Sequence, residues 1–451
     1  MIYKQRYLAR FVIECETPLS VGSGQKEILT DAPVVRDVNG LPYIPGTTLA
    51  GLLRHSLSDE EAKELMGFQD GENGRGSRVR VTEGKLVGAN GIALDGLCNI
   101  DADDDFLNYF TGILPLRQHA RIGHQGVTEE HGKFDEEVVP KGARFCFEVE
   151  LRDEEGAHVE AFQRALQLFS STHFRIGSGS RSGFGRVKVV GAWHRLLNLS
   201  VSSELSLYLD KSSSLAEEWR GWQELDLYEG SDGAFVTYQL KLRPEDFLMF
   251  SSGFGDADAD NTVVKEPMIV WHSGKGELLE RERTVVVPAS SVKGAVAHRT
   301  AFHYNRLSSQ FADFIADASA VVGESNQAVR TLFGFAAEQE ARRGVVLFSD
   351  LIWERSSGTE EVVLSHVKID RFTGGGVEGA LFQEKPLYAA EEPLVLELVL
   401  LEEVPEEVQK ALELALADIC SGHLSLGGSV QRGHGCFEGE LLKNGKKIEM
   451  L

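Results

Sequence analysis

The chain opens with apolar and polar residues in alternation. Over residues 1–15 the apolar positions are separated by charged ones such as Arg6 and Arg10, and this period of two predicts a first β-strand rather than an export signal. Two later segments, 159–169 and 408–419, instead place apolar residues at helical spacing, and the second follows a proline suited to a helix start. We therefore expect strands and amphipathic helices to alternate along the chain.

Sequence blocks from the first part of the chain return in the second part, in the same order. Self-similarity of this kind marks a repeat architecture. We interpret the chain as a tandem duplication, with a first domain over residues 1–195, a serine- and glycine-rich linker over 196–233 and a second domain over 234–451. The paired blocks are 44–54 with 287–299, 65–68 with 332–335, 118–123 with 365–370, 159–169 with 408–419, and 173–185 with 423–435.

Each half holds several strand-like runs around two helices. The order strand-helix-strand-strand-helix-strand predicts an α+β fold made of two tandem ferredoxin-like domains, each with a long central insertion. Composition agrees with an ordinary folded protein, because 42% of the 451 residues are hydrophobic and 25% are charged.

The net charge is strongly negative, since 46 Lys and Arg stand against 69 Asp and Glu, which gives −23. This balance argues against a uniformly basic nucleic-acid coat or a binder of anionic membranes. No run approaches the ~18 apolar residues of a membrane span, and five cysteines without CxxC spacing are typical of reduced thiols. We expect a cytoplasmic protein with no membrane contact. The acids concentrate outside the repeated blocks, at 101–105, 129–137, 153–155 and 402–407.

The first helix of each half begins with hydroxyl residues behind a proline. Thr47 and Thr48 match Ser290 and Ser291, and we interpret them as N-cap residues whose neighbouring N–H groups favour an anion. The second of these helices carries basic residues and no acid. An ordinary capped helix with a packing glycine is the alternative.

A glycine-rich loop follows the second helix of each half. In the first half, residues 173–195 include Arg175, Arg181 and Arg186 and no acid. Small residues let main-chain N–H groups approach phosphates while arginines supply charge, so a phosphodiester backbone fits such loops. A tight β-turn is the alternative for either loop, and neither has the spacing of a P-loop.

An aspartate precedes each of the paired helix starts. Asp31, in Asp-Ala-Pro-Val-Val-Arg-Asp, can be laid over Asp260, in Asp-Asn-Thr-Val-Val-Lys-Glu. An aspartate on a loop beside a phosphate site can hold a divalent metal or position a 2′-hydroxyl. The alternative is a turn aspartate that bonds its own backbone. In the second half Asp256 and Asp258 are competing acids.

The central insertions, 116–140 and 366–386, lack the periodicity of core segments. The second combines Lys368, Arg371 and Phe372, which suit it to gripping or wedging a nucleic-acid duplex. A surface hairpin used for oligomer contacts is the alternative. Four further residues near the C-terminus, Cys420, His423, His434 and Cys436, are of types that bind metals, but their spacing matches no zinc site. We interpret the cysteines as buried thiols beside a glycine loop.

Together these blocks resemble the RAMP superfamily, and more narrowly the repeated backbone subunits of type III CRISPR effector complexes. The resemblance rests on residues 31–37 leading into 42–54, on Leu332-Phe-Gly334, on the segment 366–374 and on the terminal glycine loops, so it covers both halves. It implies a modified RNA-recognition fold that polymerises along a CRISPR RNA and carries a protruding thumb hairpin in each domain.

By that resemblance the chain is expected to bind CRISPR RNA and, with other subunits of the complex, to cleave complementary target RNA with the help of Mg²⁺ or Mn²⁺. Asp31 matches the family's catalytic, metal-supporting aspartate, and Asp260 is its counterpart. A non-catalytic scaffold subunit and a CRISPR-RNA processing enzyme of the same superfamily are the alternatives. The residues expected to bind RNA are Thr47, Thr48, Arg54, Arg175, Gly177, Gly179, Arg181, Arg186, Ser290, Ser291, Lys293, Arg299, Lys368, Arg371, Phe372, Gly427, Gly428 and Arg432.

Overall fold

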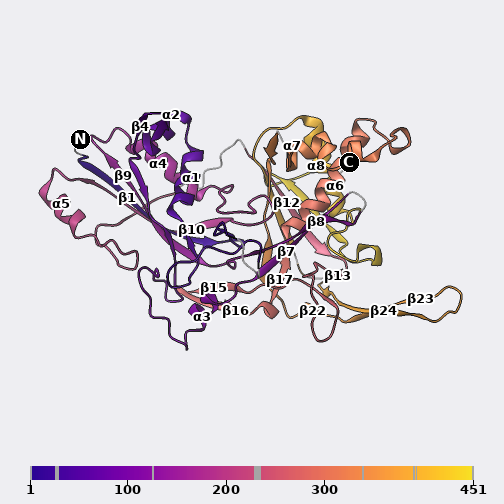
Figure 1. Ribbon diagram of the computed structural model, residues 1–451. Helices are drawn as coiled ribbons and strands as arrows, with labels where there is room; N and C mark the ends of the chain where they lie inside the picture. Colours follow the sequence, from indigo (N-terminus) through magenta and orange to yellow (C-terminus); the bar gives the residue numbers. More distant parts are fainter. Residues whose placement is uncertain are drawn as a thin grey trace.

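The computed structural model describes residues 3–25, 30–123, 126–227, 235–337, 340–389, 392 and 394–448. Figure 1 shows two bodies side by side, the first half in indigo to magenta and the second in orange to yellow. Each half is built on one antiparallel sheet, and the helices that recur in both halves pack against one face of it.

The first sheet is organised around β1 (Gln5–Cys15). This strand pairs antiparallel with β9 (Arg144–Asp153) on one side and with β10 (Val187–Asn198) on the other. β5 (Val79–Val81) and β6 (Gly84–Leu86) pair with β9 at the edge. The other elements of this half are β2 (Tyr43–Ile44), α1 (Gly46–Ser56), α2 (Asp59–Met66), β3 (Phe68–Asp70), β4 (Asn73–Arg75), α3 (Asp105–Thr111), β7 (Leu116–Ile122), β8 (Thr128–Glu137), α4 (Val159–Leu166) and the 3-10 helix η1 (Gln167–Ser170).

The second sheet has β12 (Val236–Pro244) at its centre. It pairs antiparallel with β26 (Leu394–Leu400) and β27 (Phe437–Lys443), and β26 also pairs with β20 (Val346–Phe348). The other elements are β13 (Phe247–Leu248), β14 (Asn261–Thr262), β15 (Met268–His272), β16 (Lys275–Leu279), η2 (Arg281–Arg283), β17 (Thr284–Val287), α6 (Ala289–Leu307), η3 (Ala312–Phe314), η4 (Ala318–Val321), η5 (Gly323–Ser325), α7 (Gln327–Phe333), β18 (Gly334–Ala336), β19 (Ala341–Arg343), β21 (Leu351–Glu354), β22 (Glu360–Glu361), β23 (Leu364–Ile369), β24 (Gly376–Lys385), β25 (Leu387–Tyr388), α8 (Glu406–Cys420), η6 (Val430–Arg432) and β28 (Lys446–Lys447).

The prediction of two ferredoxin-like domains is confirmed by this topology. The strand order β5-β9-β1-β10 of the first half returns as β20-β26-β12-β27 in the second, and in chain order each half runs strand, helix, strand, strand, helix, strand. Single hydrogen bonds recur as well. Arg78 N donates to Leu65 O, and Val345 N donates to Leu332 O, both at 2.9 Å. The duplication seen in the sequence is therefore a duplication of structure.

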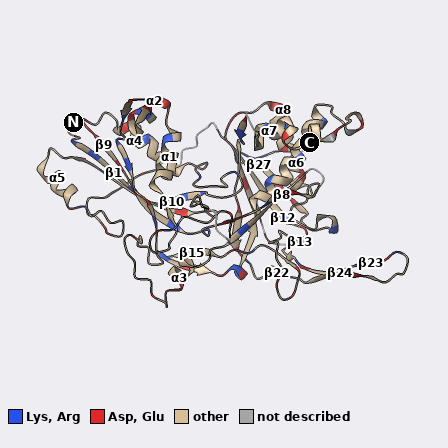
Figure 2. Ribbon diagram, in the orientation of Figure 1, with Lys and Arg blue, Asp and Glu red and all other residues tan. Residues whose placement is uncertain are grey.

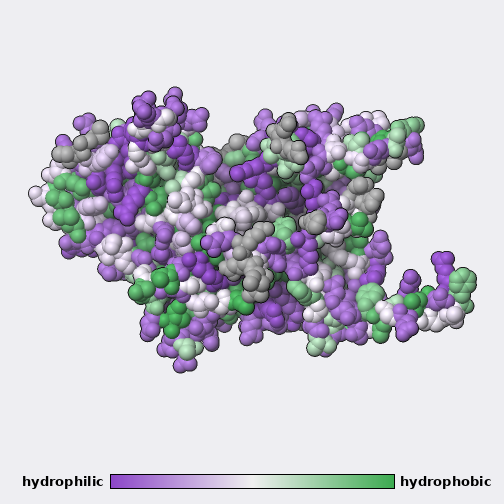
Figure 3. All heavy atoms as spheres, viewed as in Figure 1, coloured by the Kyte–Doolittle hydropathy of each residue, from purple (hydrophilic) through white to green (hydrophobic). Residues whose placement is uncertain are grey.

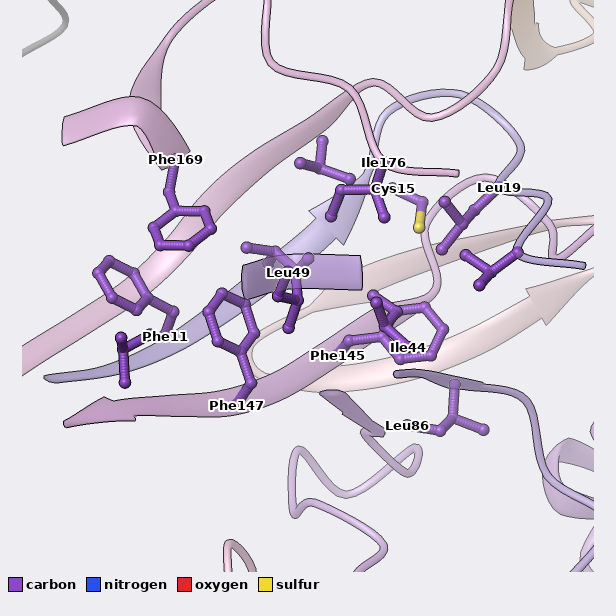
Figure 4. Packing of buried hydrophobic residues seen from close by; sticks show 14 of the residues in the cluster. Phe11, Cys15, Leu19, Ile44, Leu49, Leu86, Phe145, Phe147, Phe169 and Ile176 are labelled. Carbon is purple, nitrogen blue, oxygen red and sulfur yellow. The ribbon is translucent and has the colours of Figure 1, made fainter. Parts of the chain in front are cut away.

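Aromatic side chains fill the space between the first sheet and its helices (Figure 4). Phe11 of β1 stacks on Phe147 of β9 with ring centroids 5.5 Å apart, and Phe169 of η1 contacts both rings. Leu49 of α1 points into the same cluster, and all four side chains are fully buried. Burying each such side chain contributes roughly 1.5–3 kcal/mol. The apolar spacing that predicts the strand and the helix is thus the spacing that fills this core.

The segment predicted to be a linker adds a further layer to the first half. β10 continues to Asn198, and α5 (Ser202–Leu209) and β11 (Gln223–Glu224) follow, with β11 pairing to β10. Trp219 packs with Leu8 and Leu197, on the face of the sheet opposite to the helices. The glycine- and serine-containing end of the predicted linker lies outside the described residues.

The two halves are held together by a buried ion cluster and by a shared core. Arg117 of β7 donates to Glu266 Oε1 at 2.6 Å and to Asp350 Oδ2 at 2.8 Å, and all three residues are buried. Burial would lower the pKa of Arg117, but the two carboxylates outweigh it and raise this pKa. In the other direction, Ile269 of β15 donates its N–H to Lys141 O at 2.8 Å and joins the core of the first half. We call this contact region the seam.

The surface is polar and mixed in charge. Figure 2 shows basic and acidic residues interspersed along both halves, and the face in Figure 3 is mainly hydrophilic. In the part of the chain that the structure describes, the search for a helix long and apolar enough to cross a membrane finds none.

Candidate nucleic-acid interface and aspartate sites

A large groove lies between the hairpin β7–β8 of the first half and helix α6 of the second. Its volume is about 1630 Å³, whereas small-molecule pockets hold roughly 300–1,000 Å³. A segment of polymer therefore fits it better than a small ligand. The lining includes Tyr109, Arg117, Gln118, His119 and Lys133 from the first half, and Phe250, Phe254, Ser290, Ser291, Gly294, His298, Arg299, Phe302, Gly427 and Gly428 from the second.

The helix starts differ from the sequence prediction in one respect. The N-cap residues are Pro45 and Pro288, and neither makes a side-chain cap hydrogen bond. A proline can adopt the extended backbone of an N-cap but has no acceptor to offer. The hydroxyl residues predicted as caps lie instead in the first helical turn, where their hydroxyls remain available to a ligand. They are Thr47, Thr48, Ser290 and Ser291.

Helix α6 turns an open side to the groove. Ser290 and Ser291 line it, and a Cβ added at Gly294 would meet nothing within 4 Å. Ala289 N, in contrast, donates to the buried Asp350 Oδ1 at 2.7 Å, so one first-turn amide already has an acceptor. Internal packing therefore does not require the glycine in this helix, and its open side faces the groove.

The helix arginines expected to bind RNA also have partners within the protein. Arg299 lines the groove, pairs with Asp418 and lies with its guanidinium carbon 4.5 Å from the ring centroid of Phe302. Arg54 of α1 is exposed and donates to Gly67 O at 2.8 Å. Both guanidinium groups are thus oriented in advance and keep exposed surface.

The first glycine loop lies in the seam, and its arginines serve contacts inside the chain. Arg175 is 7% exposed, donates to Thr172 O at 2.9 Å and reaches Ser349 Oγ in the second half at 3.2 Å. Burial, together with the charge of Arg186, lowers the pKa of Arg175 to about 9. Arg186 pairs with Glu397 of the second half. Arg175 and Arg186 are therefore seam residues with partners inside the chain, and their contact with phosphate stays a prediction.

The loop glycines permit close packing of the chain. Gly177 has φ +84°, and a Cβ there would lie 2.1 Å from Ser20 O. Gly427 has φ +94°, and its Cβ would lie 2.7 Å from Met249 O. Both loops consequently press against the segment that follows the first strand of their half. Only the second loop, through Gly427 and Gly428, also lines the groove, whereas Gly177 and Gly179 do not.

Several positive charges lie close together at the seam. Burial, and then the nearby charge of Arg181, lowers the pKa of Lys293. Arg181 itself donates to Gly344 O and lies near Arg343, whose charge joins burial in lowering the pKa of Arg181. The charge of Glu402 opposes this lowering, but among the described residues no carboxylate forms an ion pair with Lys293 or Arg181. A polyanion that crossed the seam here would relieve this repulsion.

Asp31 and Asp260 occupy equivalent places in the two halves, and both are exposed. Asp31 Oδ2 accepts from Asp135 N at 3.3 Å, and Asp31 N donates to Asp135 Oδ1 at 3.0 Å. Asp260 Oδ2 accepts from Gln383 N at 2.8 Å, and Asp260 N donates to Gln383 O at 2.9 Å. Each aspartate is therefore bound through one carboxylate oxygen to the strand that leaves the hairpin of its half, β8 or β24. We call these two strands the exit strands.

The competing acids of the second half have a different partner. Lys385 Nζ donates to Asp256 Oδ2 at 3.0 Å and to Asp258 Oδ2 at 2.9 Å. The hydrogen bond from the backbone of Asp258 and the bond from Lys385 lower the pKa of Asp256 to about 2. Asp260 differs from both, because its carboxylate is bound to backbone and carries no ion pair among the described residues.

The hairpin β23–β24 projects from the second half (Figure 1). At its turn Phe372 is 97% exposed, and Lys368 and Arg371 are exposed as well. Asp370 holds the turn by accepting from Phe372 N at 3.0 Å and Thr373 N at 2.7 Å. An aromatic ring and two cations are thus presented to solvent on an ordered turn.

Sequence reasoning missed a buried glutamate that recurs in both halves. Glu136 is 7% exposed and Glu384 is 1% exposed, and each lies on an exit strand directly after the residue that holds the aspartate. His119 Nε2 lies 3.0 Å from Glu136 Oε1, and His366 Nε2 lies 2.9 Å from Glu384 Oε1. The sequence holds a signal for this pair. The blocks 118–123 and 365–370 share a histidine, and each insertion has a glutamate a few residues before the proline that closes it, Pro140 or Pro386.

The cysteines and histidines near the second glycine loop, Cys420, His423, His434 and Cys436, have surroundings other than a metal site. Within the described residues no group of three or more His, Cys, Asp and Glu side chains is placed to hold a metal ion. Burial raises the pKa of Cys420 to about 11, and Cys436 Sγ lies 3.2 Å from Ser425 Oγ. The interpretation of these cysteines as thiols packed beside a glycine loop is the one that fits.

Comparison with known proteins gives the family. The model of the RAMP superfamily matches residues 12–188 and 271–438, one region in each half. The chain belongs to the RAMP superfamily. A protein of Methanocaldococcus jannaschii named CRISPR system Cms endoribonuclease Csm3 is 27% identical to this RAMP chain over 208 residues, which cover 41% of this chain and 79% of that relative.

Proposed function

We propose that this RAMP chain is a backbone subunit of a type III CRISPR complex that binds guide RNA and cleaves complementary RNA at two aspartate sites. The observation that carries the proposal is the repeated geometry of Asp31 and Asp260, each exposed and each bound to an exit strand. The similarity to a protein named as a CRISPR endoribonuclease supports an RNA-cleaving role.

The RNA backbone would follow the groove and the seam. First-turn hydroxyls of α6, the open face at Gly294 and the backbone of Gly427 and Gly428 are groups that accept phosphates. Lys293 and Arg181 supply positive charge where the strand would pass from one half to the other. The chain's overall charge of −23 does not oppose this, because exposed charges more than about 8 Å apart are screened at physiological salt.

Asp31 and Asp260 would hold the divalent metal ion. One carboxylate oxygen of each is used by the exit strand, and the other has no hydrogen-bond partner in the described part of the chain. A carboxylate oxygen is the ligand that Mg²⁺ and Mn²⁺ prefer. The bound ion would stabilise the charge that develops on the phosphate and its oxygens during cleavage. The chain's own part is to fix the carboxylate against the hairpin and the RNA backbone beside it.

A non-catalytic scaffold is the second candidate. The observation that favours it is the isolation of both aspartates, since no three-ligand group surrounds either one among the described residues. A scaffold would use the same groove and the same positive seam for the guide, but neighbouring subunits would cut the target.

A cleavage assay on the full chain, assembled with guide RNA and the remaining subunits, tests the proposal. The double variant Asp31→Asn/Asp260→Asn is expected to lose Mg²⁺-dependent cleavage of complementary RNA and to retain the guide. Asp103→Asn, a change at an exposed acid outside the groove, is the matched control and should cleave like the unaltered chain. Cleavage at the unaltered rate by the double variant would reject the catalytic proposal in favour of the scaffold.

A further inference from the structure

One buried carboxylate in the second half connects the elements around Asp260. Glu384 lies on the exit strand β24, and its Oε1 is 2.9 Å from Nε2 of His366 on the neighbouring strand β23. Its other oxygen, Oε2, accepts from Ser429 Oγ at 2.8 Å and from Arg432 Nη1 at 3.0 Å, and both of these residues belong to the glycine loop. The hairpin and the glycine loop therefore converge on a single side chain.

The first half repeats this arrangement in part: the glutamate, the histidine and the loop serine are present, but His119 Nε2 lacks hydrogen-bond geometry and no arginine among the described residues pairs with Glu136. Glu136 Oε1 lies 3.0 Å from His119 Nε2 of β7, and Glu136 Oε2 accepts from Ser178 Oγ of the first glycine loop at 3.3 Å. The ring of His119 stacks on Phe134 with centroids 4.8 Å apart, and the corresponding rings of the second half are 4.9 Å apart. We call the glutamate, the histidine and the loop serine of each half the junction.

Backbone pairing links each junction to its aspartate. Asn261 pairs in parallel with Glu384, and Ala32 pairs in parallel with Glu136. The aspartate comes one residue earlier on the loop and bonds the backbone of the residue that precedes the glutamate. A displacement of the glutamate would consequently move the N–H group that holds the aspartate's carboxylate.

The free-energy cost of burying the Glu384 carboxylate indicates that the junction does more than fill space. A buried carboxylate is costly unless hydrogen bonds and charge compensate it. Burial would raise the pKa of Glu384, but the bond from Ser429, the charge of Arg432 and the bond from His366 outweigh it and lower this pKa. An apolar residue at this position would avoid the desolvation cost, yet both halves place an acid there beside a histidine.

We propose that Glu136 and Glu384 are positioning residues, each of which sets the aspartate of its own half against the hairpin and the glycine loop for RNA cleavage. This inference rests on the proposed function, because it assigns a role in the same reaction. It adds that the two sites are set independently, each by its own junction.

The test measures each cut separately in the assembled complex, as a single-turnover rate constant, together with guide retention and the dissociation constant for target RNA. A small displacement of a catalytic group lowers a rate on the order of 10- to 100-fold, so Glu384→Gln should slow the Asp260-dependent cut by that amount. The other cut, the guide and the target affinity should not change. Glu136→Gln should give the reverse pattern. Glu378→Gln, an exposed glutamate on the same strand β24, is the control and should leave both cuts unaltered.

The outcomes separate the inference from the proposed function. If Asp260→Asn removes a cut and Glu384→Gln leaves that cut at its full rate, the junction has no positioning role while the catalytic proposal stands. If Glu384→Gln slows both cuts equally or releases the target, its role is structural and the inference is overturned. Ser429→Ala removes one bond and keeps the carboxylate, so a smaller slowing of the same cut is expected even if the glutamate variant folds poorly. If Asp260→Asn itself removes no cut, the proposed function fails first.

Discussion

The two hairpins of this chain derive from one repeated element and have opposite environments. β7–β8 of the first half lies at the seam, where Arg117 at its base is buried against two carboxylates of the second half. β23–β24 of the second half projects away, with Phe372 almost fully exposed at its turn. The difference shows that two copies of one hairpin can take different roles in the same chain. In the first half it fixes the next domain, and in the second half it remains available to a partner.

The glycine loops show the same contrast. The first loop uses Arg175 and Arg186 to reach Ser349 and Glu397 across the seam. The second loop lines the groove instead and directs Arg432 to the junction of its own half. The first loop thus contacts the other half of the chain, whereas the second loop lines the groove and contacts its own half.

The largest expected effect is at the base of the first hairpin. Arg117→Ala leaves Glu266 and Asp350 buried without their partner, and such a loss costs about 3–5 kcal/mol in the free energy of unfolding. Urea denaturation measures it. Arg371→Ala, on the exposed turn of the second hairpin, should stay within about 0.5 kcal/mol of the unaltered chain. Equal losses in the two variants would contradict the contrast between the hairpins.

Substitution by alanine should destabilise the chain more at a glycine in the seam than at a glycine on the exposed hairpin. Gly142 has φ +85°, and a Cβ there would lie 1.9 Å from Ile269 O, whereas Gly379 has φ +71° and nothing within 4 Å. The backbone conformation alone costs roughly 1–2 kcal/mol for a residue with a Cβ. Gly142→Ala should add about 1–3 kcal/mol by forcing the seam apart. Thermal unfolding of Gly142→Ala and Gly379→Ala checks the ranking, and equal melting temperatures would refute it.

The exposed turn should matter for RNA rather than for stability. Phe372→Ala removes a ring able to stack on a base, and such stacking contributes about 1–3 kcal/mol to binding. The dissociation constant of target RNA from the assembled complex should rise accordingly, with unfolding unchanged. Leu381→Ala on the same hairpin, where the side chain is 67% exposed but aliphatic and lies outside the groove, is the matched change and should have less effect. An unaltered affinity for Phe372→Ala would remove the turn from the RNA interface.

The smallest effect is expected at the acids beside Asp260. Asp256→Asn/Asp258→Asn frees Lys385 but leaves the bond between Asp260 and Gln383, so the rate of the Asp260-dependent cut should stay within about twofold, as for other exposed ion pairs. The folded chain lowers the pKa of Asp256 to about 2 through the bonds from Asp258 N and Lys385. These bonds therefore stabilise the fold fully above the pKa that Asp256 has in the unfolded chain, and their contribution is lost as the pH falls through about 2. A collapse of the cut in this variant would show that Asp256 or Asp258 takes part in it.

The fold was predictable from the sequence because its signals are local. Helical spacing in 159–169 and 408–419 and the alternation of the first strand correspond to the residues that fill the core, including Phe169. The repeated blocks then placed the same elements in both halves. Asp31 and Asp260 were paired by sequence alone, and the structure brings both to an exit strand.

Contacts between distant segments were not predictable in the same way. The neighbours of Arg175 in sequence lack acids, which predicts a phosphate contact, but its partner Ser349 is supplied by the other half. The junction was missed for the same reason, since Glu384 and Ser429 meet only after the hairpin and the second helix have folded. The hydroxyl residues expected to cap the helices lie in the first turn instead, because Pro45 and Pro288 occupy the N-cap positions.

The central claim is that the duplication yields two separate cutting sites, and mapping the cuts in single variants tests it most directly. The assembled complex should cut one complementary RNA at two positions. Asp31→Asn should remove one of these cuts and Asp260→Asn the other, with the remaining cut at its full rate in each case. Loss of both cuts in either single variant, or of none in both, would contradict the account.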